Sequence, residues 1–282
     1  MSGAEGPGAG AGAAPSATPD GPPTPDGVAR IAAAFAGHGR RAALMPSLMG
    51  GFPDVDSSRL CGEACADGGA DLIELGIPFS DPLADGPAIH AAATHALAAG
   101  VTVEEVLGVC RSLSERLPVV LFAYANLALS PAPEDFVARA LEAGAAGLIV
   151  PDLPHEESEP LRDACDAAGL ALVALAAPNT PPERMAAIGA SARGFVYTVS
   201  LAGTTGERGA LPADLADTLG RVRAATDLPV AVGFGISTAE QAGEVAAVAD
   251  GVIVGSRVVR ACGEGGPKAV GTLVGELAEA LA

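Results

Sequence analysis

Short apolar runs alternate along this chain with longer stretches whose apolar residues recur every three or four positions. The short runs predict buried strands, and the longer Ala-rich stretches predict amphipathic helices. The expected strands are Ala43–Met49, Leu72–Leu75, Val119–Ala123, Gly147–Val150, Ala171–Ala174, Gly194–Val199, Val230–Val232 and Gly251–Val254. The expected helices are Val55–Ala66, Ala88–Ala98, Pro133–Glu142, Glu156–Ala168, Pro182–Ser191, Pro212–Ala224, Thr238–Val248 and Val270–Ala282, with additional ones at Val28–Gly37 and Val103–Arg116.

Eight repeats of strand and helix predict right-handed parallel crossovers, and eight such units close into a barrel. The fold class is therefore α/β, a (β/α)8 TIM barrel with an additional N-terminal helix. An open doubly wound sheet is the alternative. It is less favoured because eight units are present and no GxGxxG follows the first strand.

The first 26 residues are almost entirely Gly, Ala, Pro, Ser and Thr. Such a composition buries too little apolar surface to offset the entropy of ordering, so residues 1–26 are expected to form a disordered tail. Residues 27–282 then form a single catalytic domain of about the length, ~250 residues, typical of this barrel.

Charge and cysteine usage narrow the possible partners and the compartment. The net charge of −18 argues against nucleic acid and against an anionic membrane surface, because both require a basic face. No secretory signal or spanning segment is recognisable. Five scattered cysteines fit free thiols in a reducing cytoplasm. Cys61 and Cys65 lie four apart on an expected helix; core packing is favoured over metal binding, and no metal site is predicted.

Two acidic residues suggest chemistry. Glu74 lies inside an apolar run, where an ionised carboxylate needs a partner or a catalytic use. Asp85 follows in a loop rich in Pro and Gly, so the two carboxyl groups differ in environment, as acid–base catalysis requires. The alternatives are a salt bridge for Glu74 and an N-cap for Asp85 before the helix beginning near Pro87.

Glycine-rich turns predict a phosphate site. Gly233-Phe234-Gly235 follows the seventh expected strand and Gly255-Ser256 follows the eighth, the positions that hold phosphate in many barrels. Glycine lets the backbone approach the oxygen atoms, and the N–H groups of a helix N-terminus donate to them. After the sixth strand, residues 201–209 are small, polar and glycine-rich, as in a lid that excludes water.

Several motifs, in order, resemble the tryptophan synthase alpha chain family over roughly residues 28–260. The long ELGIPFSDPLADGP run from Glu74 is the most specific. The others are YAN from Tyr124, PDLP from Pro151, GFVY from Gly194, GTTG from Gly203, GFGIS from Gly233 and Gly255-Ser256. The resemblance implies a lyase that cleaves indole-3-glycerol phosphate to indole and glyceraldehyde 3-phosphate in L-tryptophan biosynthesis.

The resemblance also implies roles for individual residues. Glu74 would be the acid–base group, and Asp85 would accept a hydrogen bond from the indole N–H. The remaining positions are Tyr197, Thr205, Ile149 and Phe234 for substrate binding, with Gly206, Gly235, Gly255 and Ser256 for phosphate. No cofactor is implied in this chain; pyridoxal phosphate belongs to the beta subunit, which would join it in an alpha2beta2 complex and receive indole through a tunnel. Pro78–Asp81 and Asn126 match the docking region.

Three positions depart from the family pattern, one of them Leu127, which follows Tyr124-Ala-Asn126 where Pro is frequent. Ser47 stands where an apolar residue often contacts the indole ring, and Phe52 stands where Asp is frequent. Two alternative functions remain open at this point. One is a stand-alone indole-3-glycerol phosphate lyase that releases indole, and the other is a non-catalytic phosphate-binding barrel that activates a partner.

Overall fold

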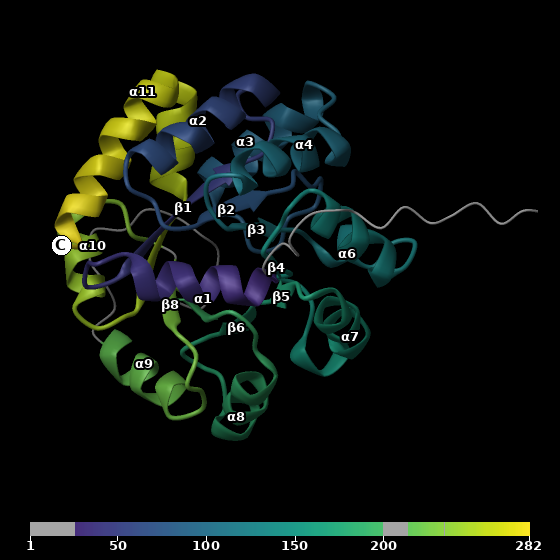
Figure 1. Cartoon of the computed structure of the whole chain (residues 1–282), viewed down its shortest axis with the longest axis vertical. Helices are drawn as coiled ribbons and strands as arrows, with labels where there is room; N and C mark the ends of the chain where they lie inside the picture. Colours follow the sequence, from purple (N-terminus) through teal and green to yellow (C-terminus); the bar gives the residue numbers. More distant parts are fainter. Residues whose placement is uncertain (1–25, 200–213, 234) are drawn as a thin grey trace, which may run out of the picture.

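The computed structural model describes residues 26–199, 214–233 and 235–282, and its parallel strands form the expected barrel (Figure 1). The strand order is β5-β4-β3-β2-β1-β9-β8-β7-β6, in which the first strand, β1, pairs with the last, β9. Each neighbouring pair is parallel, so all the strand C-termini lie at one end. The strands are β1 (Ala43–Met49), β2 (Ile73–Gly76), β3 (Val119–Phe122), β4 (Gly147–Ile149), β5 (Ala171–Leu172), β6 (Ala174–Ala176), β7 (Val196–Val199), β8 (Val230–Gly233) and β9 (Gly251–Val254).

The fifth expected strand is divided in two, which corrects the sequence-based prediction of one strand at Ala171–Ala174. β5 pairs with β4, whereas β6 pairs with β7. Between them, the Val173 N–H donates to the Leu148 carbonyl at 2.9 Å. At Val173 the chain thus passes from pairing with β4 to pairing with β7. The barrel is closed at this point by the continuous backbone between β5 and β6. Nothing in the run Ala-Leu-Val-Ala-Leu-Ala signals the break, because it contains no Gly or Pro.

Helices follow the strands around the outside of the barrel (Figure 1). They are α1 (Gly27–Gly37), α2 (Val55–Asp67), α3 (Pro87–Ala98), α4 (Val103–Ser114), α5 (Ala125–Ala128), α6 (Pro133–Glu142), the 3-10 turn η1 (His155–Glu157), α7 (Glu159–Ala168), α8 (Pro182–Ser191), α9 (Leu215–Arg223), α10 (Ala239–Ala246) and α11 (Ser256–Ala280). The last helix begins at Ser256, well before the expected Val270. Gly266, with φ +60°, interrupts it, followed by Pro267.

Helix α1 closes the N-terminal end of the barrel, and Figure 1 shows it lying across the strands. Ile31 is fully buried in the interior cluster. A Cβ atom at Gly147 would lie 3.1 Å from the Ile31 side chain, and one at Gly251 would lie 2.8 Å from Phe35. Glycine at these strand starts therefore allows the helix to approach. Asp26, assigned to the tail from sequence, caps α1 by accepting from the Ala29 N–H at 2.7 Å.

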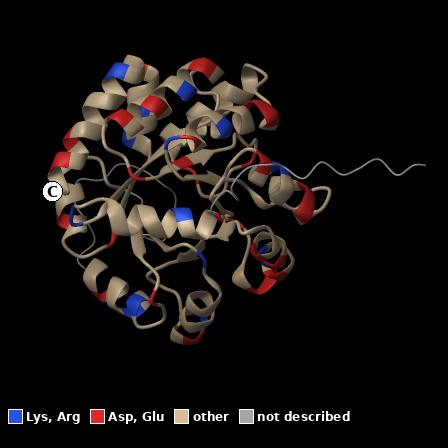
Figure 2. Ribbon diagram, viewed as in Figure 1, with Lys and Arg blue, Asp and Glu red and all other residues tan. Residues whose placement is uncertain are grey.

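Charged side chains lie mainly on the outer helices and loops, where acidic residues predominate (Figure 2). Among the described residues that are fully buried, Glu74 is the only Asp, Glu, Lys or Arg. In the described part of the chain, the one buried residue of these four types thus lies at the position that the sequence marked for chemistry. None of the helices in the described part of the chain is both long enough and apolar enough to span a bilayer.

Candidate active site

Glu74 lies on β2 with its side chain 6 % exposed. The Ser47 hydroxyl donates to its Oε1 atom at 2.5 Å, and Oε2 has no hydrogen-bond partner among the described residues. Burial is the main cause that raises the pKa of Glu74 to about 7; the Ser47 hydrogen bond opposes the rise, and the nearby Asp85 charge contributes to it. The alternative of a structural salt bridge is wrong for the part of the chain described, since no Lys, Arg or His there pairs with Glu74.

Asp85 lies in the loop between β2 and α3 and is half-buried. Burial raises its pKa, whereas a hydrogen bond with Tyr124 and the nearby His90 lower it. The alternative role as an N-cap is wrong, because Gly86 holds the N-cap position of α3 and no side chain caps that helix. The carboxyl group is therefore held at the cavity by contacts other than helix capping.

Tyr124 fixes the loop that carries Asp85. Its ring stacks on Phe79 with a centroid distance of 5.1 Å, and its hydroxyl accepts the Ala84 N–H at 3.1 Å. The same hydroxyl is hydrogen-bonded to Asp85. One buried aromatic residue thus holds the loop at both ends.

One cavity brings most of the predicted site residues together at the C-terminal end of the barrel. Its lining includes six of them: Glu74, Asp85, Tyr197, Gly235, Gly255 and Ser256. Ile149 does not line it; this side chain is fully buried in the interior cluster beneath. Thr205, Gly206 and Phe234, together with the expected lid, lie outside the described residues. Ser47, Met49, Ile89, Phe122 and Ile253 complete much of the wall.

Tyr197, on β7, contributes a buried ring to this cavity. Desolvation raises the pKa of its hydroxyl well above the ordinary value, and the Glu74 charge adds to the rise. A Cβ atom at Gly233 would lie 2.1 Å from that hydroxyl. Glycine at the end of β8 is therefore required by the tyrosine next to it, a constraint absent from the sequence-based reasoning.

The part of the cavity next to β9 presents backbone donors. Gly255 precedes α11, and Ser256 begins it, so the first N–H groups of a long helix lie at the cavity edge. Gly235 adopts φ +87°, a conformation that favours glycine. Backbone N–H groups at a helix N-terminus bind anions well. This arrangement agrees with the phosphate site expected from the glycine turns.

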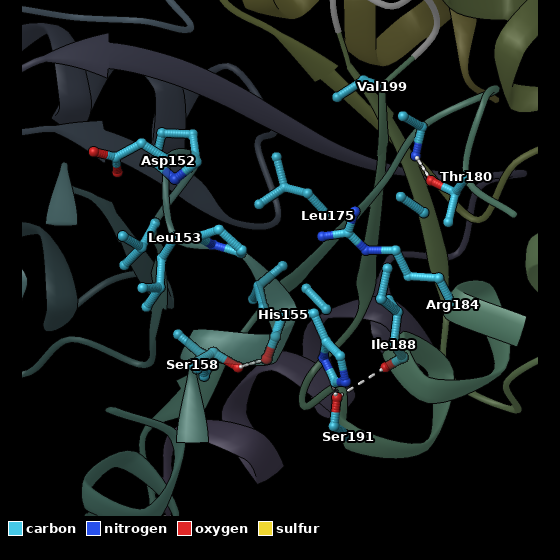
Figure 3. A pocket seen from close by; sticks show the side chains of 18 of the residues that line it. Asp152, Leu153, His155, Ser158, Leu175, Thr180, Arg184, Ile188, Ser191 and Val199 are labelled. Carbon is cyan, nitrogen blue, oxygen red and sulfur yellow. Dashed lines mark hydrogen bonds between the residues drawn. The ribbon is translucent and has the colours of Figure 1, made fainter. Parts of the chain in front are cut away.

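A larger cavity, of about 480 Å³, lies beside β4, β6 and α8 (Figure 3). It contains His155, whose Nδ1 atom is 3.3 Å from the Ser191 hydroxyl, and Arg184, which is paired with Glu156 at 2.9 Å. The side chains of Ser158, Thr180 and Ser191 in its wall also have hydrogen-bond partners, and it contains neither Glu74 nor Asp85. The smaller cavity is the better candidate for the active site, because it combines a carboxyl group whose pKa is near 7, that of Glu74, with a second acidic residue, Asp85.

Sequence reasoning missed the functional contacts of Ser47 and Tyr124. A single hydroxyl in the apolar run 43–49 was a usable signal, and the register that pairs Ser47 with Glu74 completes it. Tyr124 was noted as part of a motif only, because its approach to Asp85 depends on the fold of an intervening loop. Cys61 and Cys65 are free and buried, and no three His, Cys, Asp or Glu side chains in the described residues converge as metal ligands.

A barrel closed at one end, with a buried carboxyl group of pKa about 7 beside a second acid and a helix N-terminus, defines an acid–base enzyme that takes an anionic substrate.

The sequence matches the tryptophan synthase alpha chain family model over residues 34–278. It is 48 % identical over 244 residues to the tryptophan synthase alpha chain of Synechococcus elongatus, covering 86 % of this chain and 92 % of that one. The Gloeobacter violaceus alpha chain is 46 % identical over 260 residues, covering 91 % and 92 %. A structure of Mycobacterium tuberculosis tryptophan synthase superposes with a TM-score of 0.84 at 38 % identity, covering 89 % of this chain and 98 % of that one.

This chain belongs to the tryptophan synthase alpha chain family. It is a carbon–carbon lyase of tryptophan biosynthesis, and its reaction is the retro-aldol cleavage of indole-3-glycerol phosphate to indole and glyceraldehyde 3-phosphate. The resemblance drawn from the sequence motifs is confirmed.

Proposed function

We propose that Glu74 is the acid–base group of this cleavage and that Asp85 stabilises the positive charge formed on the indole ring. The observation that carries the proposal is the pairing of these two acids in one cavity. Glu74 is buried, and its Oε2 atom has no hydrogen-bond partner among the described residues, while Asp85 is more exposed and held by Tyr124. The different environments allow Glu74 to be protonated while Asp85 is ionised.

The reaction begins with neutral Glu74, which gives its proton to C3 of the indole ring. The Asp85 carboxylate accepts a hydrogen bond from the ring N–H and stabilises the resulting cation. Glu74, now ionised, takes the proton from the side-chain hydroxyl. The carbon–carbon bond then breaks, its electron pair returns to the ring, and indole and glyceraldehyde 3-phosphate form with no net gain or loss of protons.

This sequence of steps requires a protonated acid near neutral pH. The raised pKa of Glu74, about 7, keeps a substantial share of these carboxyl groups protonated near neutral pH. Asp85 must be ionised, so activity should fall at acid pH as Asp85 is protonated and at alkaline pH as Glu74 loses its proton. The expected pH profile is therefore bell-shaped.

The rest of the cavity positions the substrate. Gly235, Gly255 and Ser256 bind its phosphate through backbone N–H groups, assisted by Gly206. Tyr197 and the apolar wall hold the indole ring, which suits an apolar surface. By family resemblance, Phe234 extends that wall and Thr205 positions Asp85, whereas Ile149 lies outside the cavity lining. These last roles follow from the sequence motifs.

The cleavage needs no cofactor from this chain, because the protonated ring itself accepts the electrons of the broken bond. Pyridoxal phosphate belongs to a beta subunit, with which we propose an alpha2beta2 complex. In support, the loop containing Pro78–Asp81 also carries Leu83, an apolar side chain 75 % exposed, and Asn126 is exposed as well. Five buried free thiols support a cytoplasmic location.

Indole formation from indole-3-glycerol phosphate, with and without a beta subunit, tests the proposal. Glu74→Gln should lower the rate by at least ~10²-fold, and Asp85→Asn should be nearly inactive. Glu142→Gln, an exposed change on α6, is the matched control. A Glu74→Gln rate close to that of the parent would reject the assignment. A fast parent rate that the beta subunit does not change would instead favour the stand-alone lyase.

A further inference from the structure

We propose that Ser47 is a positioning residue that binds Oε1 of Glu74 and thereby reserves Oε2 as the oxygen that exchanges protons with the substrate. The proposal rests on the acid–base role of Glu74. Ser47 touches the reacting carboxyl group and acts through it.

Strand pairing brings the two side chains together. Ser47 on β1 is the register partner of Glu74 on β2, so both point to the same face of the barrel wall. Both side chains line the candidate cavity, and each residue is 6 % exposed. A hydroxyl in an otherwise apolar buried strand is costly unless it is hydrogen-bonded, and the Glu74 carboxyl group supplies that partner.

The hydrogen bond distinguishes the two oxygens of Glu74. A serine hydroxyl has a single proton, and Ser47 donates it to Oε1 at 2.5 Å. Oε2 is buried, lies on a residue that lines the cavity and has no partner among the described residues. When Glu74 is protonated on Oε2, Oε1 remains a carbonyl oxygen and still accepts the same bond. Ser47 therefore fits both protonation states without moving.

Among the described groups around Glu74, Ser47 is the main one that stabilises its ionised form. Asp85, from the loop after β2, and Tyr197, from β7, face it from neighbouring elements, and neither carries a positive charge. Loss of the Ser47 bond would remove a contact that favours the ionised carboxylate. Accordingly, the pKa of Glu74 should rise in its absence.

Ser47 also lies beside the phosphate turn. A Cβ atom at Gly255 would lie 3.6 Å from the Ser47 Cβ. Ser47 therefore lies between Glu74, to which it is hydrogen-bonded, and this turn. The small side chain leaves room there while keeping its hydroxyl on the carboxyl group.

Ser47→Ala, measured in the purified full-length chain, is the direct test. We expect kcat for cleavage to fall about tenfold, as for one lost hydrogen bond to a charged group, with KM within about twofold of the parent. The alkaline limb of the kcat–pH profile should move to higher pH. Ser47→Thr keeps the hydroxyl, so its kcat and the position of its alkaline limb should match those of the parent. Thr198→Val, which removes a hydroxyl from the wall of the same barrel away from the cavity lining, is the control.

Infrared titration locates the proton independently of turnover. The carbonyl band of protonated Glu74, identified by its loss in Glu74→Gln, should shift to higher frequency in Ser47→Ala because Oε1 loses its donor. Ser47→Thr should leave the band near its parent position, which keeps the test available if Ser47→Ala folds poorly.

An unchanged band and an unchanged alkaline limb in folded Ser47→Ala would overturn the inference. That result would leave the role of Glu74 intact as long as Glu74→Gln is inactive. An active Glu74→Gln would instead overturn the proposed function itself.

Discussion

Replacing Glu74 with Gln should stabilise the protein while it abolishes catalysis, and the gain should depend on pH. Folding raises the pKa of this carboxyl group from 4.5 to about 7, chiefly by burial. Well below pH 4.5 the group is protonated in both the folded and unfolded states, so its ionisation does not lower the free energy of unfolding. As pH rises through the interval from 4.5 to 7, the unfolded state ionises first, so the parent loses stability relative to the Gln variant.

The expected size of this effect follows from the two pKa values. At ~1.4 kcal/mol for each tenfold change in proton affinity, the full difference comes to about 3 kcal/mol. Gln has nearly the same shape, and its carbonyl oxygen can still accept from Ser47. The free energy of unfolding of Glu74→Gln should therefore exceed that of the parent by about 3 kcal/mol more at pH 8 than at pH 4.5.

Urea denaturation of the parent and the variant at both pH values measures this difference. Glu142→Gln, a change on the exposed surface of α6, should show no comparable pH-dependent gain. If the gap between parent and Glu74→Gln is the same at both pH values, Glu74 ionises as freely in the folded protein as in the unfolded chain. The argument for a buried acid would then fail.

Three further changes probe the surroundings of the site and the fold. Tyr124→Phe removes a hydrogen bond to Asp85, so the acid limb of the kcat–pH profile should move to higher pH; an unmoved limb would show that the tyrosine does not tune this acid. Asp26→Ala removes the cap of α1 and should lower the free energy of unfolding by about 1 kcal/mol in urea. Thr198→Val removes a buried hydroxyl that lacks a partner among the described residues, and should raise it by about 1 kcal/mol; a loss of stability would contradict this.

The architecture was largely predictable from local pattern. Strands buried on both sides read as short apolar runs, and the helices between them carry a regular periodicity. The division of the fifth strand at Val173 was not predictable, because it depends on which neighbour each half pairs with. The first half of α11 was also missed, since Gly263, Gly265 and Gly266 weaken the helical signal there.

The acidic pair was predictable for a different reason. A Glu in an apolar run is unusual enough to stand out, and the long motif that starts with it carries Asp85 as well. Their supporting contacts were not predictable, because Ser47 lies 27 positions from Glu74 and Tyr124 lies 40 positions from Ala84. Only strand register and loop folding bring such distant positions together.

The helix across the lower end of the barrel has a consequence for the passage of molecules. With Ile31 and Phe35 packed against the strand starts, the described residues leave no passage at that end, so substrate and products must pass the strand C-terminal end. A protein bound over the strand C-terminal end would therefore control both the entry of substrate and the release of products.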